Sequence, residues 1–147
     1  MTDARSLNAS ARLRQLIDLT RRLTERLGDE ARAFEARRPQ DAAASIAETH
    51  DLANVYRRES AQLKANPSSV SDAPPAERAA LIRATEAFEV VLARHARAVE
   101  AARVISEGLV RTIAAEVASL RGSPSAYGPG GHANPGDSRA VAFNRTA

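Results

Sequence analysis

The sequence predicts an all-α protein: an antiparallel helical hairpin, a very long C-terminal helix of coiled-coil type, and a disordered C-terminal tail. Alanine supplies 32 of the 147 residues and arginine supplies 20, and both are strong helix formers. Aromatic residues make up only 3% of the chain, too few for the cross-strand packing of a β-sandwich or barrel. Apolar residues also recur three and four positions apart over most of the first 121 residues, which is the spacing of a helix.

The first helix is expected over residues 6–38. Apolar and small side chains share one face of it at helical spacing, and Pro39 ends it because proline cannot donate a backbone hydrogen bond inside a helix. The residues of this face are Leu13, Leu16, Thr20, Leu23, Leu27, Ala31 and Phe34.

The second helix is expected over residues 40–65, with a thinner apolar stripe. The short break around Pro39 favours an antiparallel hairpin with the first helix. Prolines and serines over residues 66–75 then predict a loop. The stripe of the second helix consists of Ile46, Ala53, Tyr56 and Leu63.

The third helix is expected over residues 75–121. From Leu81 onward, the positions of its stripe follow one another at intervals of four and three residues without interruption. At 1.5 Å per residue it is roughly 65–70 Å long. This length exceeds a compact domain of this size, so the helix projects or forms a coiled coil. Its stripe is Leu81, Thr85, Phe88, Leu92, His95, Val99, Ala102, Ser106, Leu109, Ile113, Glu116 and Leu120, and beside it lie Val91, Ala98, Ile105, Val110 and Val117.

The last residues, 122–147, differ in composition from the rest. They hold five of the seven glycines and three of the seven prolines. Such a segment buries too little apolar surface to offset its ordering entropy. We therefore expect a single helical domain over residues 1–121 and a flexible tail over residues 122–147, with one short apolar patch at Ala140–Phe143.

The chain lacks the residues of an active site or a metal site. It contains no cysteine, which excludes disulfides and thiolate ligands. His50, His95 and His132 have no partner at ligand spacing, so zinc is not expected. His95 falls on the apolar stripe and is interpreted as a core-edge histidine bonded to a neighbour, with a ligand or pH-sensing role as the alternative. We expect no enzyme activity, no metal and no cofactor.

The charge and hydropathy of the chain argue against nucleic acid and membranes as binding partners. The net charge is only +3, and residues 75–85 offer Arg78 and Arg83 rather than the dense basic run of a DNA-binding helix. No stretch reaches the ~18 apolar residues of a membrane span, and no signal peptide is recognisable. We expect a cytoplasmic protein that neither binds nucleic acid nor inserts into a membrane.

The remaining surface suited to function is the C-terminal half of the third helix. The two shorter helices cannot cover all of it, and exposed apolar surface of this kind marks a protein-binding site. The predicted contact residues are Leu109, Ile113, Val117 and Leu120. The alternative occupant of this surface is a second copy of the chain, in a homodimer.

At this point the chain resembles the FlgN-type flagellar export chaperones. The shared features are the order and lengths of the helices, the heptad pattern of the last helix, and the segment Tyr127-Gly128-Pro129-Gly130-Gly131 directly after it. The high arginine content and the end of the chain, Val141–Arg145, are similar to alphaproteobacterial flagellar versions. The tail beyond Gly131 is longer than in other members.

The resemblance implies a cytoplasmic chaperone for hook-filament junction proteins, which are secreted hook-associated subunits. In that family the last helix holds an amphipathic terminal segment of the client, and a C-terminal tyrosine contacts the cytoplasmic domain of the export gate. Tyr127 matches that tyrosine, and a plain linker aromatic is the other interpretation. The alternative functions are a structural or regulatory coiled-coil protein of the export apparatus and a generic homodimeric coiled coil.

Overall fold

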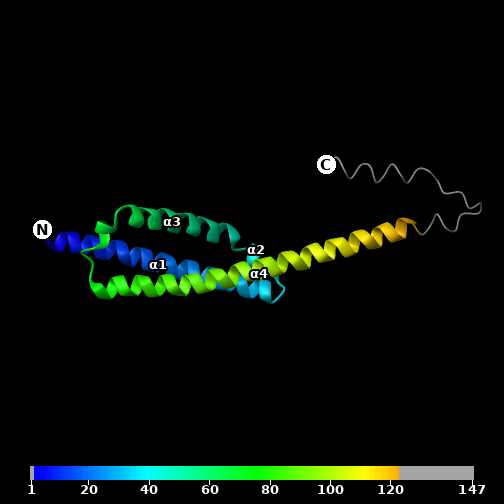
Figure 1. Cartoon of the computed structure of the whole chain (residues 1–147), viewed down its shortest axis with the longest axis horizontal. Coiled ribbons are helices and arrows are strands. Elements are labelled where there is room, and N and C mark those ends of the chain that lie inside the picture. Colours follow the sequence, from blue (N-terminus) through cyan, green and yellow to red (C-terminus); the bar gives the residue numbers. More distant parts are fainter. Residues whose placement is uncertain (1, 123–147) are drawn as a thin grey trace, which may run out of the picture. The chain divides into compact units, whose positions relative to one another are not determined.

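The computed structural model describes residues 2–122, and every element in this range is helical (Figure 1). The predicted all-α class is therefore confirmed over these residues. The predicted tail lies outside them except for Gly122, which is the last residue of the last helix. The chain divides into two compact units, Met1–Arg103 and Val104–Ala147, called here the N-terminal and C-terminal units. The elements are α1 (Thr2–Glu35), α2 (Pro39–Ala43), α3 (Ile46–Ala65), the 3-10 helix η1 (Pro67–Val70) and α4 (Pro75–Gly122).

α1 ends at Glu35 in a C-terminal cap of the Schellman type. The backbone N–H of Arg38 donates to the carbonyl of Ala33 at 2.9 Å, and that of Arg37 donates to Phe34 at 3.1 Å. Arg37 has a φ of 59°, the left-handed conformation that this cap requires and that glycine adopts most easily. The helix thus ends three residues earlier than predicted, because the cap forms before Pro39.

The segment predicted as one helix over residues 40–65 forms two helices. α2 is a single short turn that begins at Pro39, and α3 starts at Ile46 after a break at Ser45. The Ser45 hydroxyl lies 3.1 Å from the carbonyl oxygen of Ala42 and 3.1 Å from Oε1 of Glu30, so its one proton is shared between these two acceptors. Serine forms such local bonds in competition with helix, so residues 44–45 separate two helices that apolar spacing alone would join.

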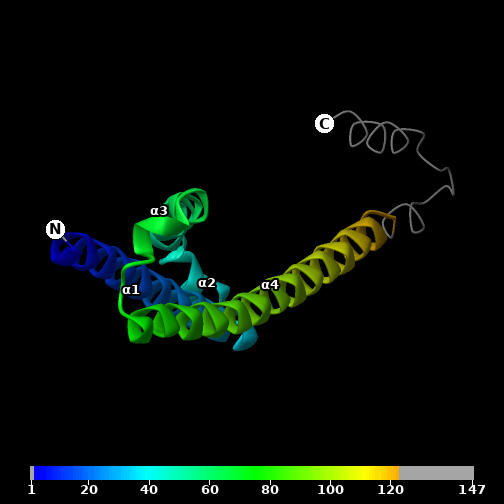
Figure 2. The same ribbon diagram turned by 60° about the vertical axis from the view of Figure 1, so that its left-hand side comes forward.

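α1 and α3 form the predicted antiparallel hairpin. Arg26 near the end of α1 reaches the start of α3, where its Nε donates to Thr49 Oγ1 at 3.2 Å and its Nη2 lies 2.5 Å from Glu48 Oε2. Figure 1 shows α3 lengthwise beside α1, and in Figure 2 α3 is seen nearly end-on. Ile46, predicted to be part of the α3 stripe, is 48% exposed and lies outside the core.

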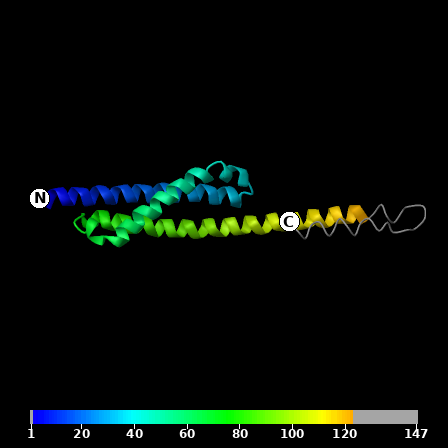
Figure 3. The same ribbon diagram turned by 90° about the horizontal axis from the view of Figure 1, so that it is seen from above.

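Within the N-terminal unit, the first part of α4 runs parallel to α1, as the side views indicate (Figures 1 and 3). Residues further along α1 contact residues further along α4, as expected for parallel helices. Ser10 bonds Glu77 near the start of each helix, and His95 lies against Glu30 further along. α3 brings the chain back to the start of α1. Residues 66–74, which contain η1, then connect α3 to α4, and Val70 and Ala73 pack there against Ala9 and Leu13 of α1.

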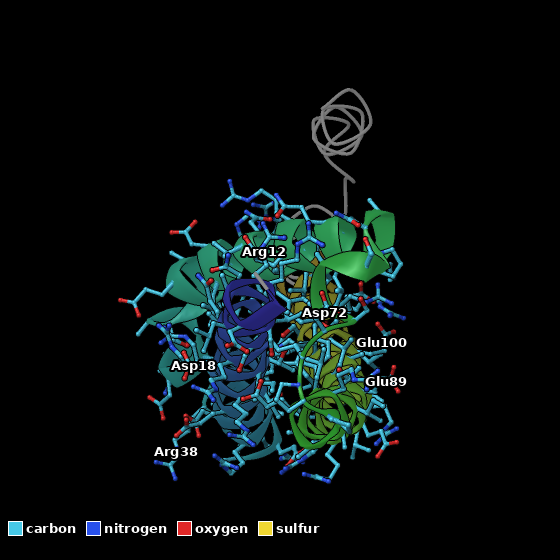
Figure 4. All side chains as sticks on the ribbon, turned by 90° about the vertical axis from the view of Figure 1, so that its left-hand side faces the viewer. Arg12, Asp18, Arg38, Asp72, Glu89 and Glu100 are labelled. Carbon is cyan, nitrogen blue, oxygen red and sulfur yellow. The ribbon has the colours of Figure 1, made fainter. Side chains whose placement is uncertain are left out.

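The core of the N-terminal unit lies along α1. The buried side chains of its predicted face are confirmed, from Leu13 at 1% exposed to Ala31 at 0%, with Thr20 also at 0%. Leu23 and Leu27 meet Phe88 of α4, and Tyr56 of α3 stacks at an angle on Phe88 with the ring centroids 5.0 Å apart. In Figure 4, Asp18, Arg38, Glu89 and Glu100 point outward from this core.

Candidate protein-binding face of α4

Inside the N-terminal unit, the buried face of α4 differs slightly from the apolar stripe predicted from the sequence. Val91 is half-buried and Ala98 is 6% exposed, whereas Leu92 and Val99 are 44% and 38% exposed. Phe88 is buried and His95 is half-buried, as the stripe predicts. The buried face is therefore rotated by about one residue toward the side of Val91 and Ala98.

The rotation follows from the small residues of α1. Gly28 is buried, and a Cβ built at this position would lie 3.8 Å from Cγ1 of Val91. Ala31, one turn further on, is fully buried. Small side chains let two helices approach closely, so Val91 packs over Gly28. The pattern of α4 alone carries no information about this feature of α1.

Polar contacts secure the C-terminal end of α1 to α4. Glu30 is buried, and its two carboxylate oxygens lie 3.0 Å from His95 Nε2 and 3.1 Å from Ser45 Oγ. Phe34 presents its ring at 83° to the His95 ring, with the centroids 6.2 Å apart. The interpretation of His95 as a core-edge histidine bonded to a neighbour is confirmed.

Two carboxylates tie α1 to α4 electrostatically. Glu35 accepts two hydrogen bonds from Arg94, at 2.8 and 2.7 Å, which lower the pKa of Glu35 and raise that of Arg94. Glu77 accepts from Ser10 Oγ at 2.5 Å and from Arg14 Nε at 2.8 Å. The hydrogen bond from Ser10, followed by the bond and charge of Arg14, lowers the pKa of Glu77.

An apolar groove between helices of the N-terminal unit was missed by the sequence analysis. It has a volume of about 490 Å³ and opens between α3 and the start of α4, with Leu16 and Thr20 of α1 also lining it. Tyr56 and Leu63 line it from α3, and Leu81 lines it from α4. These side chains were assigned to helix stripes, and a stripe does not reveal where two helices diverge.

In the C-terminal unit, every described side chain of α4 is exposed. The four predicted contact residues share one face: Leu109 is 59% exposed, Ile113 51%, Val117 43% and Leu120 66%. Ile105 at 54% and Val110 at 65% extend the same face on either side. We call these six side chains the distal face.

The distal face continues the spacing of the buried Ala98 and the half-buried Ala102, which precede it in α4. Ala98 and Ala102 are followed at intervals of three and four by Ile105, Leu109 and Ile113. Positions 104, 111 and 118, which hold Val104, Arg111 and Ala118, lie on the opposite side of the helix by the same periodicity. The distal face is therefore an apolar stripe of the width that a helix normally buries.

The described residues contain no group of three or more metal-ligating side chains. None of their helices is long and apolar enough to cross a membrane. Over this range no buried side-chain nitrogen or oxygen lacks a hydrogen-bond partner. Tyr127, the predicted export-gate contact, lies outside the described residues, as does the apolar patch Ala140–Phe143.

Fold and surface together define a helical protein with a helical hairpin packed on one half of a 48-residue helix and an apolar face on the other half. The chain is 49% identical over 145 residues to the flagellar basal-body protein FlbY of Caulobacter vibrioides, covering 97% of both chains. The chain therefore belongs to the FlbY family. No family model matches it, and no solved structure matches it.

Proposed function

We propose that this protein works in the bacterial flagellum as a cytoplasmic type III export chaperone. Its clients are secreted hook-associated proteins at the hook-filament junction, and it delivers them to the export gate. The observation that carries the proposal is the distal face, where six large apolar side chains are exposed on one side of α4. The FlbY relative, a flagellar basal-body protein by name, supports the flagellar setting.

The distal face has the chemistry that a client helix requires. An amphipathic helix binds a partner through apolar anchors at positions i, i+3, i+4 and i+7. Leu109, Ile113, Val117 and Leu120 follow one another at intervals of four, four and three residues, which places them on one face of α4 opposite such anchors. A client segment that otherwise self-assembles buries its apolar stripe here, which keeps it monomeric until export.

A structural role in the flagellum is the second candidate. The name of the relative, a basal-body protein, favours a component that remains in the assembly rather than a carrier. On this alternative the distal face packs permanently against a neighbouring subunit. The two roles differ in whether the bound partner is a secreted subunit.

Direct titration separates the two candidates. The purified full-length chain is titrated by calorimetry with each secreted hook-associated protein of the same bacterium in turn. The chaperone role predicts saturable binding to at least one of them, which is lost when the client's terminal amphipathic segment is deleted. Binding to none of them, together with co-purification of the chain with isolated basal bodies, contradicts the chaperone role and favours the structural one.

The export gate is the second partner in the proposal. Tyr127 is the contact that the resemblance to FlgN-type chaperones implies, and aromatic anchors supply much of the energy of small interfaces. Tyr127→Ala is expected to weaken binding to the cytoplasmic domain of the gate by about tenfold or more and to leave client binding intact. Unchanged gate affinity, or an equal loss of client binding, contradicts this assignment.

A further inference from the structure

Two polar residues interrupt the apolar stripe of α4 beyond Arg103. In heptad terms, Ser106, Ile113 and Leu120 occupy one core position, and Ala102, Leu109 and Glu116 occupy the other. Ser106 and Glu116 are both exposed. A carboxylate in the middle of an apolar seam is costly to bury unless a hydrogen-bond donor meets it.

Two copies of this helix supply that donor to each other in one arrangement. When they pair antiparallel about an axis at position 111, Leu109 of one copy meets Ile113 of the other. In the same register, Ser106 of one copy faces Glu116 of the other, and this match occurs twice because the axis is two-fold. Ala102 then faces Leu120, so the remaining layers are apolar.

Other pairings lose this match. A parallel, in-register pair places Glu116 opposite Glu116, and two like charges that face each other are destabilising. Shifting the antiparallel pair by one heptad in either direction places Glu116 against Ile113 or Val99, which leaves the carboxylate without a donor. The polar residues therefore select both the orientation and the register.

The same serine–glutamate contact already joins two helices within this molecule. Between α1 and α4, the Ser10 hydroxyl donates to Glu77 Oε2 at 2.5 Å, while Arg14 Nε donates to Glu77 Oε1 at 2.8 Å, and the side chain of Glu77 is 18% exposed. A serine on one helix thus donates to one oxygen of a glutamate on its neighbour at a packed interface of this chain. The antiparallel pair repeats that contact twice.

We propose that, without a client, two copies of this chain pair antiparallel through residues 102–120 of α4, with Ser106 of each copy hydrogen-bonded to Glu116 of the other. This inference rests on the proposed function, because the pair buries the residues assigned to the client. Self-pairing and client binding are then mutually exclusive, and client binding releases a monomer. The pairing protects the distal face while no client is present.

The size of the paired surface makes the dimer reversible. Residues 102–120 span about 27 Å of helix. Specific stable interfaces bury about 1,200 Å² or more in total, and a single helix pair of this length lies at the low end of that range. A dissociation constant on the order of micromolar is expected, so that a client of higher affinity displaces the second copy.

The test is sedimentation of the full-length chain across concentrations from about 1 to 300 μM, a range chosen to bracket micromolar dissociation. A monomer–dimer equilibrium is expected. Ile113→Asp places a charge in the central apolar layer and is expected to weaken the dimer at least about tenfold. Ala118→Asp places the same charge on the opposite side of the helix and is expected to leave the dimer unchanged. Circular dichroism shows whether both variants remain helical.

Cysteine cross-linking tests the register, because the native chain has no cysteine. Ser106→Cys and Glu116→Cys chains are oxidised separately and as a mixture. The proposed register predicts a disulfide-linked dimer in the mixture only. A covalent dimer of Ser106→Cys chains alone indicates parallel pairing and overturns the proposal.

Adding a hook-associated client that binds the chain separates this inference from the proposed function. Conversion of dimer to a complex of one chain and one client supports it. A chain that is monomeric throughout yet binds client overturns self-pairing and leaves the chaperone role standing. A dimer that binds client without dissociating overturns the mutual exclusion, and a dimer that binds no client contradicts the chaperone role alone.

Discussion

His95 of α4 and Glu30 of α1 meet at the point where the helical hairpin ends, with Nε2 and Oε2 3.0 Å apart. The side chain of Glu30 is 4% exposed and that of His95 is 20% exposed. The second oxygen of Glu30 accepts from Ser45, so one buried carboxylate links α1, the residue directly before α3, and α4. α1 ends five residues later, at Glu35.

Removing His95 is expected to destabilise the N-terminal unit. His95→Ala leaves one oxygen of the buried Glu30 carboxylate without its partner, which costs about 1–3 kcal/mol. Urea denaturation followed by circular dichroism measures the change in the free energy of unfolding. In a double-mutant cycle, adding Glu30→Ala is expected to recover part of this loss. If the double variant lost as much free energy of unfolding as the two single variants together, the two side chains would not interact.

Much of the fold could be predicted from the sequence because helix periodicity is a local property. The buried face of α1 and the length of α4 both follow from spacing within a single helix. The break at Ser45 was missed because it depends on a tertiary hydrogen bond to Glu30. The inward position of Val91 was missed because it depends on Gly28 of another helix.

The candidate site was predictable for a related reason. The exposure of Leu109 and Ile113 follows from comparing helix lengths, since the shorter helices cannot reach them. The groove lined by Tyr56 and Leu81 was not predicted, because it depends on how far α3 and α4 diverge. Spacing along one helix does not specify the distance to another.

Arg37 offers a stabilising substitution. It holds a φ of 59°, and a left-handed conformation costs a residue with a Cβ roughly 1 kcal/mol. Arg37→Gly is expected to raise the free energy of unfolding by up to about 1 kcal/mol, because glycine is the preferred residue at this capping position. Arg38→Gly, one residue beyond the left-handed position, is the matched control and is expected to bring no gain. Thermal unfolding of both variants measures the difference.

Gly108 is the interior glycine of the C-terminal part of α4. A Cβ at this position meets nothing within 4 Å, and glycine in a helix interior is about 0.8–1 kcal/mol less favourable than alanine. Gly108→Ala is therefore expected to increase the helicity of this segment, measured by amide hydrogen exchange over residues 104–122. Exchange rates that do not slow in the variant would contradict the prediction.

Acid should weaken the contacts between α1 and α4. The pKa values of Glu35 and Glu77 are lowered from 4.5 in the folded protein, so their ionised forms stabilise the folded state. This contribution is complete above the unfolded-state pKa and is lost as the pH falls through the lower folded-state values. The free energy of unfolding should therefore decrease below about pH 4.5.

The variant Glu77→Gln tests that assignment. Its stability is expected to be lower than that of the native chain at pH 7 and to fall less steeply between pH 5 and pH 3, the window set by carboxylate titration. Glu86→Gln, at an exposed position of α4, is the control and should keep the native pH dependence. An unchanged slope in Glu77→Gln would show that this carboxylate does not contribute.

Charge substitutions on opposite sides of α4 show whether the distal face binds the client. The affinity of a hook-associated client is measured by calorimetry for the native chain, Ile113→Asp and Ala118→Asp. We expect Ile113→Asp to lose about 2 kcal/mol or more of binding free energy, roughly thirtyfold in affinity, and Ala118→Asp to keep the native affinity. Native client affinity in an Ile113→Asp chain that remains fully helical would contradict this expectation.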